Sequence, residues 1–197
     1  MGRVERYLII IGMGLVLTGC PPDCEQIEYD FGTLPAEALE LVPYVDGATY
    51  SLRHSAGHEI FFYCQRERSI ENEYWDHCVS VIYEEDITTL SPDYPIFDMA
   101  IFMRKNDSIH SSVIAHIGQS NFTLPHMDDY GGEYAHFDSL KLDGNWYRDV
   151  YAIKSNTSYY SYDSGIFPDS LWYNTTKGIL KVGMSNDEFY QLIPQDE

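Results

Sequence analysis

The chain has 197 residues, with 12 Lys and Arg against 31 Asp and Glu, so its formal net charge is −19 at pH 7. This length suits one domain with a full hydrophobic core. Proteins bind nucleic acid by placing Lys and Arg against phosphate, and here no basic stripe offsets the acidic excess. We therefore expect no nucleic-acid partner.

The first twenty residues have the three parts of an export leader. Arg3 and Arg6 stand against Glu5 in a short basic start, and residues 7–17 (YLIIIGMGLVL) form an unbroken apolar run. A run of this length is too short for a hydrocarbon core, which needs about 20 apolar residues. It fits the apolar region of a cleavable export signal, and Leu-Thr-Gly-Cys follows at residues 17–20.

The Leu-Thr-Gly-Cys motif resembles the lipobox of bacterial lipoproteins. The resemblance implies that the Cys20 thiol receives diacylglycerol and that the chain is cut just before this residue. Removing residues 1–19 would take away two basic residues and one acidic residue, for a net charge of about −20. We expect a signal peptide at 1–19, a lipidated tether at 20–33 and a single domain at 34–197. Acyl chains such as palmitate would hold this domain to a membrane of the bacterial cell envelope.

Lipidation of Cys20 leaves three other cysteines, which are Cys24, Cys64 and Cys78. An exported chain occupies a compartment where disulfides persist. A hairpin could bring Cys64 and Cys78 face to face, so we favour a Cys64–Cys78 disulfide. The alternative is that Cys24 pairs with one of these two and fastens the tether to the domain. A CxxC motif is absent, so thioredoxin-like redox chemistry has no support.

The first half of the domain reads as one short helix followed by strands. Residues 34–42 (LPAEALELV) suit a short helix between Pro35 and Pro43, with a strand as the alternative. The predicted strands are residues 49–54, 59–65, 78–83, 96–104 and 109–117, with turn residues between several of them. A polar, charged loop is expected over residues 65–77.

The second half continues the β pattern. Residues 134–142 and 146–154 flank Asp143-Gly144-Asn145, a strong hairpin motif. A long loop rich in Ser, Tyr and Gly is expected over residues 155–168, before predicted strands at 171–174, 179–184 and 188–193. The 17 Tyr, 9 Phe and 3 Trp suit half-buried pleated surfaces. Together these features predict an all-β, antiparallel sandwich or partly closed barrel with at most a short N-terminal helix.

The C-terminal third carries a second resemblance. Its sequence reads YRDVY at 147–151, WYN at 172–174, GILK at 178–181 and FYQL at 189–192. This order is similar to the end of small bacterial envelope lipoproteins that have no assigned activity. The resemblance implies a closing β-meander and carries over no functional residues.

The residue types needed for catalysis or metal binding do not assemble into a recognisable pattern. The seven histidines are scattered, and His54 and His58 flank a predicted turn; an HExxH motif and paired zinc cysteines are both absent. The acidic runs at 84–86 and 128–129 suggest solvated strand ends rather than a calcium site. The densest polar cluster, which we interpret as a glycine-rich turn, comprises His126, Asp128, Asp129 and Glu133. We therefore predict no catalytic residue, no metal and no cofactor.

Two weaker features concern ligands and modification. Aromatic residues on or beside the 155–168 loop could form a platform for carbohydrate or peptide, and we name Tyr159, Tyr160, Tyr162, Trp172 and Tyr173. A core with a loop folded over it is the alternative. Three Asp-Ser-aliphatic triplets resemble the O-glycan acceptor triplet of some bacterial envelopes, with acceptors at Ser108, Ser139 and Ser170.

The sequence leaves three hypotheses for function. The first is a non-enzymatic envelope lipoprotein whose β domain binds a carbohydrate or protein partner. The second is an envelope hydrolase, which would need two carboxylates about 5–10 Å apart in one pocket. The third is a lipid carrier, which would need a roomy apolar cavity.

Overall fold

The computed structural model describes residues 24–94, 96–107, 109–125, 133–156 and 165–194. Within these ranges the chain forms one short helix and twelve strands. Their bounds are β1 Ile27–Asp30, α2 Ala36–Leu39, β2 Thr49–His54, β3 Glu59–Tyr74, β4 Val79–Pro92, β5 Met99–Lys105, β6 Ser111–Ile117, β7 Ser120–Thr123, β8 Tyr134–Leu142, β9 Asn145–Lys154, β10 Pro168–Asn174, β11 Gly178–Met184 and β12 Phe189–Leu192.

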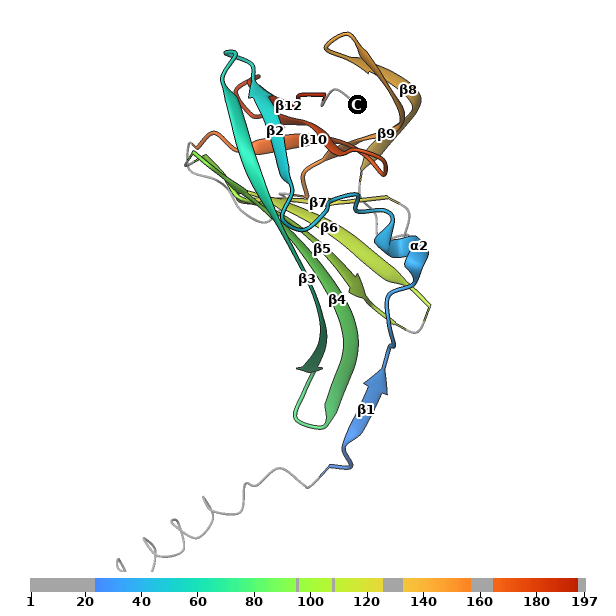
Figure 1. The fold of residues 1–197 in the computed structure, drawn as a ribbon. Coiled ribbons are helices and arrows are strands. Elements are labelled where there is room, and N and C mark those ends of the chain that lie inside the picture. The colour runs from blue at the N-terminus through green and yellow to red at the C-terminus, as the bar shows by residue number, and fades with distance from the viewer. Residues whose placement is uncertain (1–23, 95, 108, 126–132, 157–164, 195–197) are drawn as a thin grey trace, which may run out of the picture.

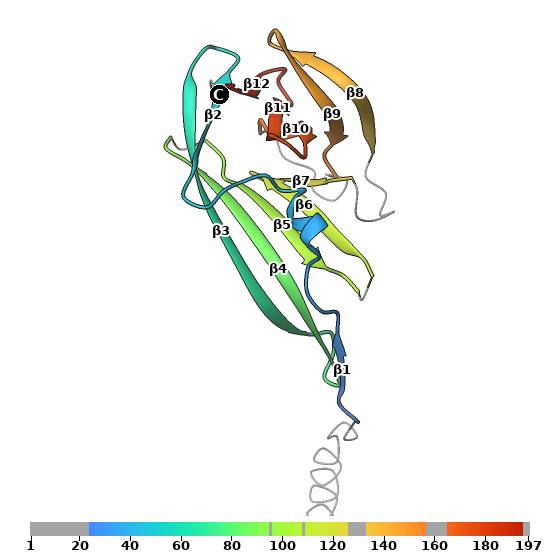
Figure 2. The ribbon, with the colours of Figure 1, turned by 45° about the vertical axis from the view of Figure 1, so that its right-hand side comes forward.

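Eleven strands join into one sheet in the order β7-β6-β5-β4-β3-β2-β12-β11-β10-β9-β8, and β1 pairs with β4 outside this path. Neighbours along the path are antiparallel, whereas β1 is parallel to β4. The sheet curls so that strands β4–β7 face strands β10–β12 (Figures 1 and 2). The predicted antiparallel all-β fold with one short helix is confirmed, and the partly closed barrel is the architecture that forms.

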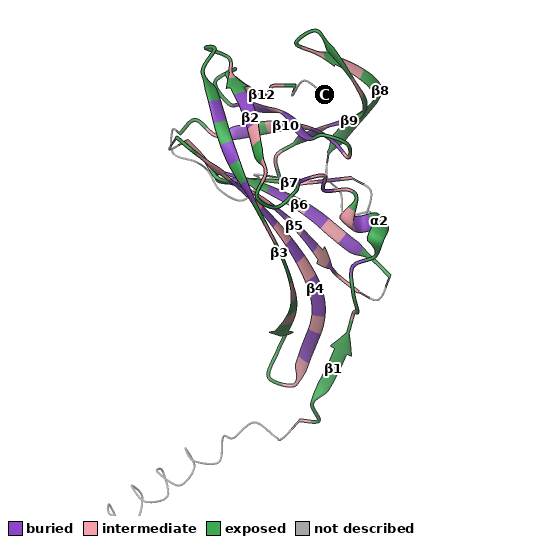
Figure 3. Cartoon of the chain, in the orientation of Figure 1, coloured by how far each residue is buried: buried purple, intermediate pink, exposed green. Residues whose placement is uncertain are grey.

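The concave face of the curled sheet carries the hydrophobic core. Side chains alternate between the two faces of a strand, so on β5 and β6 every second residue is buried. Figure 3 shows this alternation as bands along β4–β6. The segment around α2 covers the core through Leu34, Ala38, Val42 and Tyr44. The short helix predicted at 34–42 is therefore present, and it is stabilised by this burial rather than by its own length.

Arg66 fastens the α2 segment to the sheet. Its Nε lies 2.9 Å from Oδ1 of Asp86, whose side chain is nearly fully buried. Its Nη1 donates hydrogen bonds of 3.0 Å to the backbone carbonyls of Val42 and Tyr44. The buried carboxylate of Asp86 needs this partly buried guanidinium, because an unpaired buried charge is strongly destabilising.

A second ion pair, two residues further along β3, fastens the chain just before α2 to the sheet. Arg68 Nε donates to Oε1 of Glu84 at 2.6 Å, and the backbone N–H of Leu34 donates to Oε2 of Glu84 at 2.6 Å. The hydrogen bond from Arg68 is the main reason why the pKa of Glu84 is lowered. The prediction that the acidic run at 84–86 is a solvated strand end is therefore wrong, since it lies in the middle of β4.

The loop expected over residues 65–77 is also largely a strand. β3 continues to Tyr74 and pairs with β4 from Phe62 opposite Pro92 to Tyr74 opposite Ser80. The charged residues of this stretch obscured the strand pattern. Arg66 and Arg68 project onto the concave face, where carboxylates of β4 meet them.

The disulfide joins Cys24 to Cys78, with 5.8 Å between their Cα atoms. The predicted Cys64–Cys78 disulfide is wrong, and the alternative that fastens the tether through Cys24 is the one formed. Cys64 lies opposite Leu90, so at 3.3 Å per residue it is about 40 Å along β4 from Cys78. A disulfide cannot bridge Cα atoms more than about 7 Å apart. Cys64 is a buried free thiol, 2% exposed.

The hairpin predicted around Asp143-Gly144 is confirmed. Both turn residues have positive φ, 44° at Asp143 and 84° at Gly144, as a two-residue type I′ turn requires. The strand β7 was not predicted. No helix within the described ranges is long and apolar enough to cross a membrane. The leader and the lipidation site at Cys20 lie outside the described residues.

Candidate functional site

One cleft is lined by residues of β2 and β12 and of the turns beside them. These elements lie at the end of the molecule opposite β1 (Figure 1). The cleft lies between the β2–β3 turn, the β8–β9 turn and the residues that follow β12, and its volume is about 430 Å³. Sites for small ligands have volumes of roughly 300–1,000 Å³. Five residues that line it matter below, namely Arg53, His54, Asp143, Phe189 and Gln191.

A row of cross-strand neighbours runs from this cleft along the outer face of the sheet. Arg53 of β2 stands opposite Gln191 of β12, which stands opposite Lys181 of β11. Lys181 in turn stands opposite Trp172 of β10. Directly opposed residues share one face of a sheet. The row therefore brings two cations, an amide and an indole ring onto one face of the sheet, although these four side chains come from four different strands.

Lys181 is the central cation of this row. Its Nζ lies 4.9 Å from the centroid of the Trp172 ring and 4.2 Å from that of Phe189. Partial burial lowers the pKa of this ammonium. Among the described residues it makes no ion pair. Aromatic faces attract a cation but do not neutralise it, so its charge is available to an anion.

Arg53 connects the two walls of the cleft weakly. Its Nη1 lies 3.8 Å from Oδ2 of Asp143 in the β8–β9 turn, and both side chains are more than half exposed. Exposed pairs of this kind contribute about 0–1 kcal/mol. An anionic ligand could therefore displace Asp143 at little cost.

The cations near this cleft differ from three arginines of β3 and β5 in how closely a carboxylate approaches them. Arg66, Arg68 and Arg104 each have a carboxylate at 2.9 Å or closer. On the β8–β9 hairpin, by contrast, Lys141 and Arg148 are exposed and form no ion pair with any described residue. Lys141, Arg148 and Lys181 therefore have no ion-pair partner among the described residues, and the buried Lys105 at the end of β5 likewise has none.

The predicted aromatic platform is only partly present. Tyr173 is 2% exposed and its hydroxyl donates to the carbonyl of Leu41, so it belongs to the core. Burial raises its pKa well above the ordinary value. Trp172 is half-buried and joins the cationic row, whereas Tyr159, Tyr160 and Tyr162 lie outside the described residues. The sequence reasoning missed Lys181, because a lone lysine in an apolar strand gave no pattern.

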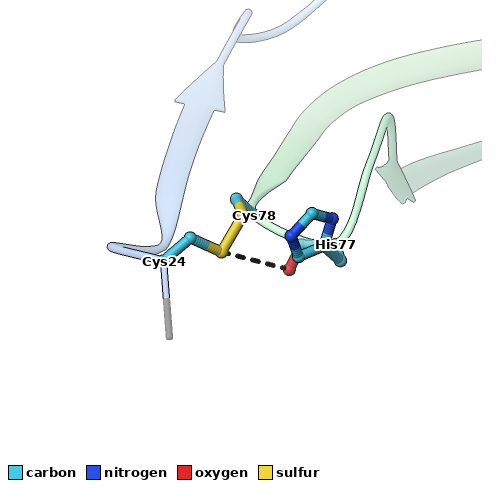
Figure 4. A group of neighbouring side chains, drawn as sticks. All are labelled: Cys24, His77 and Cys78. Carbon is cyan, nitrogen blue, oxygen red and sulfur yellow. Dashed lines mark hydrogen bonds between the residues drawn. A yellow bond between two sulfur atoms is a disulfide. The ribbon is translucent and has the colours of Figure 1, made fainter. Parts of the chain in front are cut away.

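The histidines bring no metal site to this cleft within the described part of the chain. The ring of His54 contacts that of Tyr190 at a tilt of 54°, and its Nε2 lies 3.7 Å from Oε2 of Glu188. One group with metal-ligand geometry occurs among the described residues, formed by Cys24, His77 and Cys78 (Figure 4). Both of its sulfurs are in the disulfide, and thiolates, not disulfides, bind metal.

Two further clefts bear on the alternative functions. Among the described residues, a cleft of about 490 Å³ beside Phe97 and Phe167 is lined by one carboxylate, that of Asp98, and the cleft at Arg53 likewise by one, that of Asp143. Within the described part of the chain, neither lining offers the carboxylate pair that a glycoside hydrolase needs. A space of about 10 Å³ in the core, next to Phe62, holds at most about one water, far less than an acyl chain needs.

The three glycan acceptor candidates have different environments. Ser139 is exposed on β8, and Ser170 is partly buried with its hydroxyl donating to Oδ1 of Asp169 at 2.7 Å. Ser108 lies outside the described residues. Glycosylation of these serines stays a prediction.

Comparison with protein-family models, with curated protein sequences and with solved structures gives no match to this chain. What the protein binds must therefore be inferred from its own residues. The cationic row and the cleft beside it are the features to explain.

Proposed function

We propose that this protein is a membrane-anchored lipoprotein of the bacterial envelope whose β domain binds an anionic ligand without transforming it. The observation that carries the binding proposal is Lys181. Its ammonium is partly buried, lies on two aromatic rings and is not neutralised by any described carboxylate. Cation–π contacts attract the ammonium without cancelling its charge, so an anionic ligand can still pair with it.

The ligand class that fits best is an acidic carbohydrate. Its carboxylate or phosphate groups would meet Lys181 and Arg53, and its sugar rings would lie against Trp172 and Phe189. Aromatic rings bury apolar faces while charge-assisted hydrogen bonds set the orientation. The cleft volume of about 430 Å³ is large enough for a few sugar units.

The anchor is supported by the leader and by the position of the disulfide. Cys24 lies four residues after Cys20, and its bond to Cys78 holds the start of the domain at the end opposite the cleft (Figure 1). A tether at one end and a binding cleft at the other would suit a protein that presents its ligand site away from the membrane. Mass spectrometry of the native protein tests lipidation. We expect a diacylglycerol-modified Cys20 as the first residue, and an unmodified Met1 would contradict the proposal.

The binding proposal is tested with acidic and neutral polysaccharides and the chain 20–197. We expect the acidic polysaccharides to bind and Lys181→Met to weaken binding about tenfold or more, the effect of losing one charge-assisted contact. Lys154→Met is the matched control, because Lys154 is exposed on β9 and lies 3.6 Å from Glu133. Equal binding by the Lys181→Met variant, or no preference for acidic polysaccharides, would overturn the proposal.

A further inference from the structure

The end of the molecule opposite the cleft carries exposed aromatic side chains. Tyr74 and Trp75, at the turn between β3 and β4, are 69% and 57% exposed, and Tyr29 of β1 is 48% exposed. The Trp75 ring centroid lies 6.5 Å from that of Tyr29 and 5.9 Å from that of Phe31. We call Tyr29, Phe31, Tyr74 and Trp75 the aromatic tip.

The disulfide ties this aromatic tip to the proposed anchor. Cys78 follows Trp75 by three residues, and Cys24 precedes Tyr29 by five. Cys24 follows Cys20 by four positions, and four steps of the chain span at most about 14 Å. If Cys20 is lipidated, the Cys24–Cys78 bond keeps the tip of the long β3–β4 hairpin within this reach of the bilayer surface.

We propose that the aromatic tip enters the headgroup region of the bilayer that holds Cys20. This inference rests on the proposed lipid anchor. Trp and Tyr collect at membrane–water interfaces because their rings are apolar at one end and polar at the other. Exposed large aromatic groups are otherwise costly to leave in water, and nothing in the described chain covers them.

The charges at the tip define the lipid that fits. Glu25, Glu28 and Asp76 are close in sequence to the residues of the aromatic tip, and the cation of Arg104 is already 2.8 Å from the carboxylate of Glu73. Carboxylates are repelled by an anionic surface, whose potential acts within a Debye length. The tip therefore suits zwitterionic headgroups, such as phosphatidylethanolamine or phosphatidylcholine, better than phosphatidylglycerol.

A second point of contact would orient the domain. A lipid anchor alone would hold the domain at one point, whereas an anchor plus the aromatic tip would hold it at two and would keep the long axis of β3 and β4 pointing away from the bilayer. The cleft at the far end would then point away from the membrane (Figures 1 and 2). Burial of the aromatic tip in the headgroup region would also strengthen the membrane binding that the acyl chains provide.

The test uses the chain 20–197 coupled through Cys20 to a maleimide lipid in phosphatidylcholine vesicles. Coupling is selective without reductant, because Cys24 and Cys78 are in the disulfide and Cys64 is buried. Trp75 becomes the single reporter after Trp146→Phe and Trp172→Phe. We expect lipids brominated near the headgroup to quench its emission about twofold, with a shift to shorter wavelength.

The matched control keeps Trp146 as the single reporter, after Trp75→Phe and Trp172→Phe. Trp146 is 69% exposed in the β8–β9 hairpin, at the opposite end of the molecule, and we expect no quenching there. Quenching of Trp75 should weaken in vesicles rich in phosphatidylglycerol and in the Cys24→Ser/Cys78→Ser variant, which is no longer held by the disulfide. An unquenched Trp75, or equal quenching of Trp75 and Trp146, would refute the proposal.

This design separates the two proposals. The maleimide lipid replaces the natural anchor, so the vesicle experiment has an outcome whether or not the bacterium lipidates Cys20. Failure of lipidation is detected only in the mass of the native N-terminal residue. Failure of the aromatic tip is detected only in the quenching of Trp75.

Discussion

Replacing both disulfide cysteines, in Cys24→Ser/Cys78→Ser, should destabilise the domain measurably. The bond closes a loop with a sequence separation of 54 residues. In the chain-entropy treatment of the unfolded state, a loop of this length corresponds to about 4 kcal/mol. This figure is an upper value, because all four residues of β1 are exposed and the strand can fray once the bond is gone. Fraying restores entropy to the folded state, so we expect a loss of about 2–4 kcal/mol.

Urea unfolding followed by circular dichroism measures this loss as a lower midpoint with a similar slope. The unmodified chain should respond to a dithiol reductant by a comparable amount, and the double variant should not respond at all. Hydrogen exchange at Ile27 and Phe31, whose N–H groups bond to the carbonyls of Cys78 and Ile82, reports on β1 directly. Equal midpoints for the two chains without reductant would refute the reasoning. So would a reductant response that disappears in Cys64→Ala, since Cys64 would then be in the bridge.

Three further predictions follow from individual contacts. Arg66→Met leaves the carboxylate of Asp86 buried without its partner and should lower the free energy of unfolding by about 3–5 kcal/mol in urea titrations. The pKa of Glu84 is lowered in the folded state, so ionised Glu84 stabilises the fold at pH values above its ordinary pKa of about 4.5. This stabilisation is lost as the pH falls through the folded-state pKa, and urea midpoints measured against pH will show the loss. Gly178→Ala should cost about 1–3 kcal/mol, because φ is +79° there and a Cβ would overlap the Tyr44 hydroxyl; the melting temperature measures this.

Matched variants separate each cause from a general loss of stability. Arg104→Met removes an ion pair with both side chains more than a third exposed, and we expect a loss of at most about 1 kcal/mol. In Arg68→Met the acid dependence due to Glu84 should shrink, because the main hydrogen bond to its carboxylate is gone. Gly144→Ala has open space for its Cβ and should show only the backbone cost of φ +84°, about 1 kcal/mol. If Arg104→Met lowers the free energy of unfolding as much as Arg66→Met does, burial of the Asp86 carboxylate is not the cause of the loss.

Local patterns in the sequence were enough for the strand content. The bounds of the strands at 49–54 and 134–142 match the structure, as does the Asp143-Gly144 turn, because alternation and turn residues act over a few positions. Arg66 and Arg68 interrupt the alternation of apolar and polar residues along β3, so the predicted strand ended at residue 65 although β3 continues to Tyr74. Those side chains are compatible with a buried face only because Asp86 and Glu84 meet them from the neighbouring strand.

The sequence by itself determined the acidic charge, the β character, the short helix and the candidate leader that ends just before Cys20. Only the tertiary structure decided the disulfide partner of Cys78, the buried ion pairs and the row that brings Lys181 to Trp172. The physical reason is that register between strands sets which distant residues meet, and a single sequence contains no direct record of that register. Cys64 and Cys78 are closer in sequence than Cys24 and Cys78, yet a long hairpin holds the first pair apart and a parallel strand brings the second pair together.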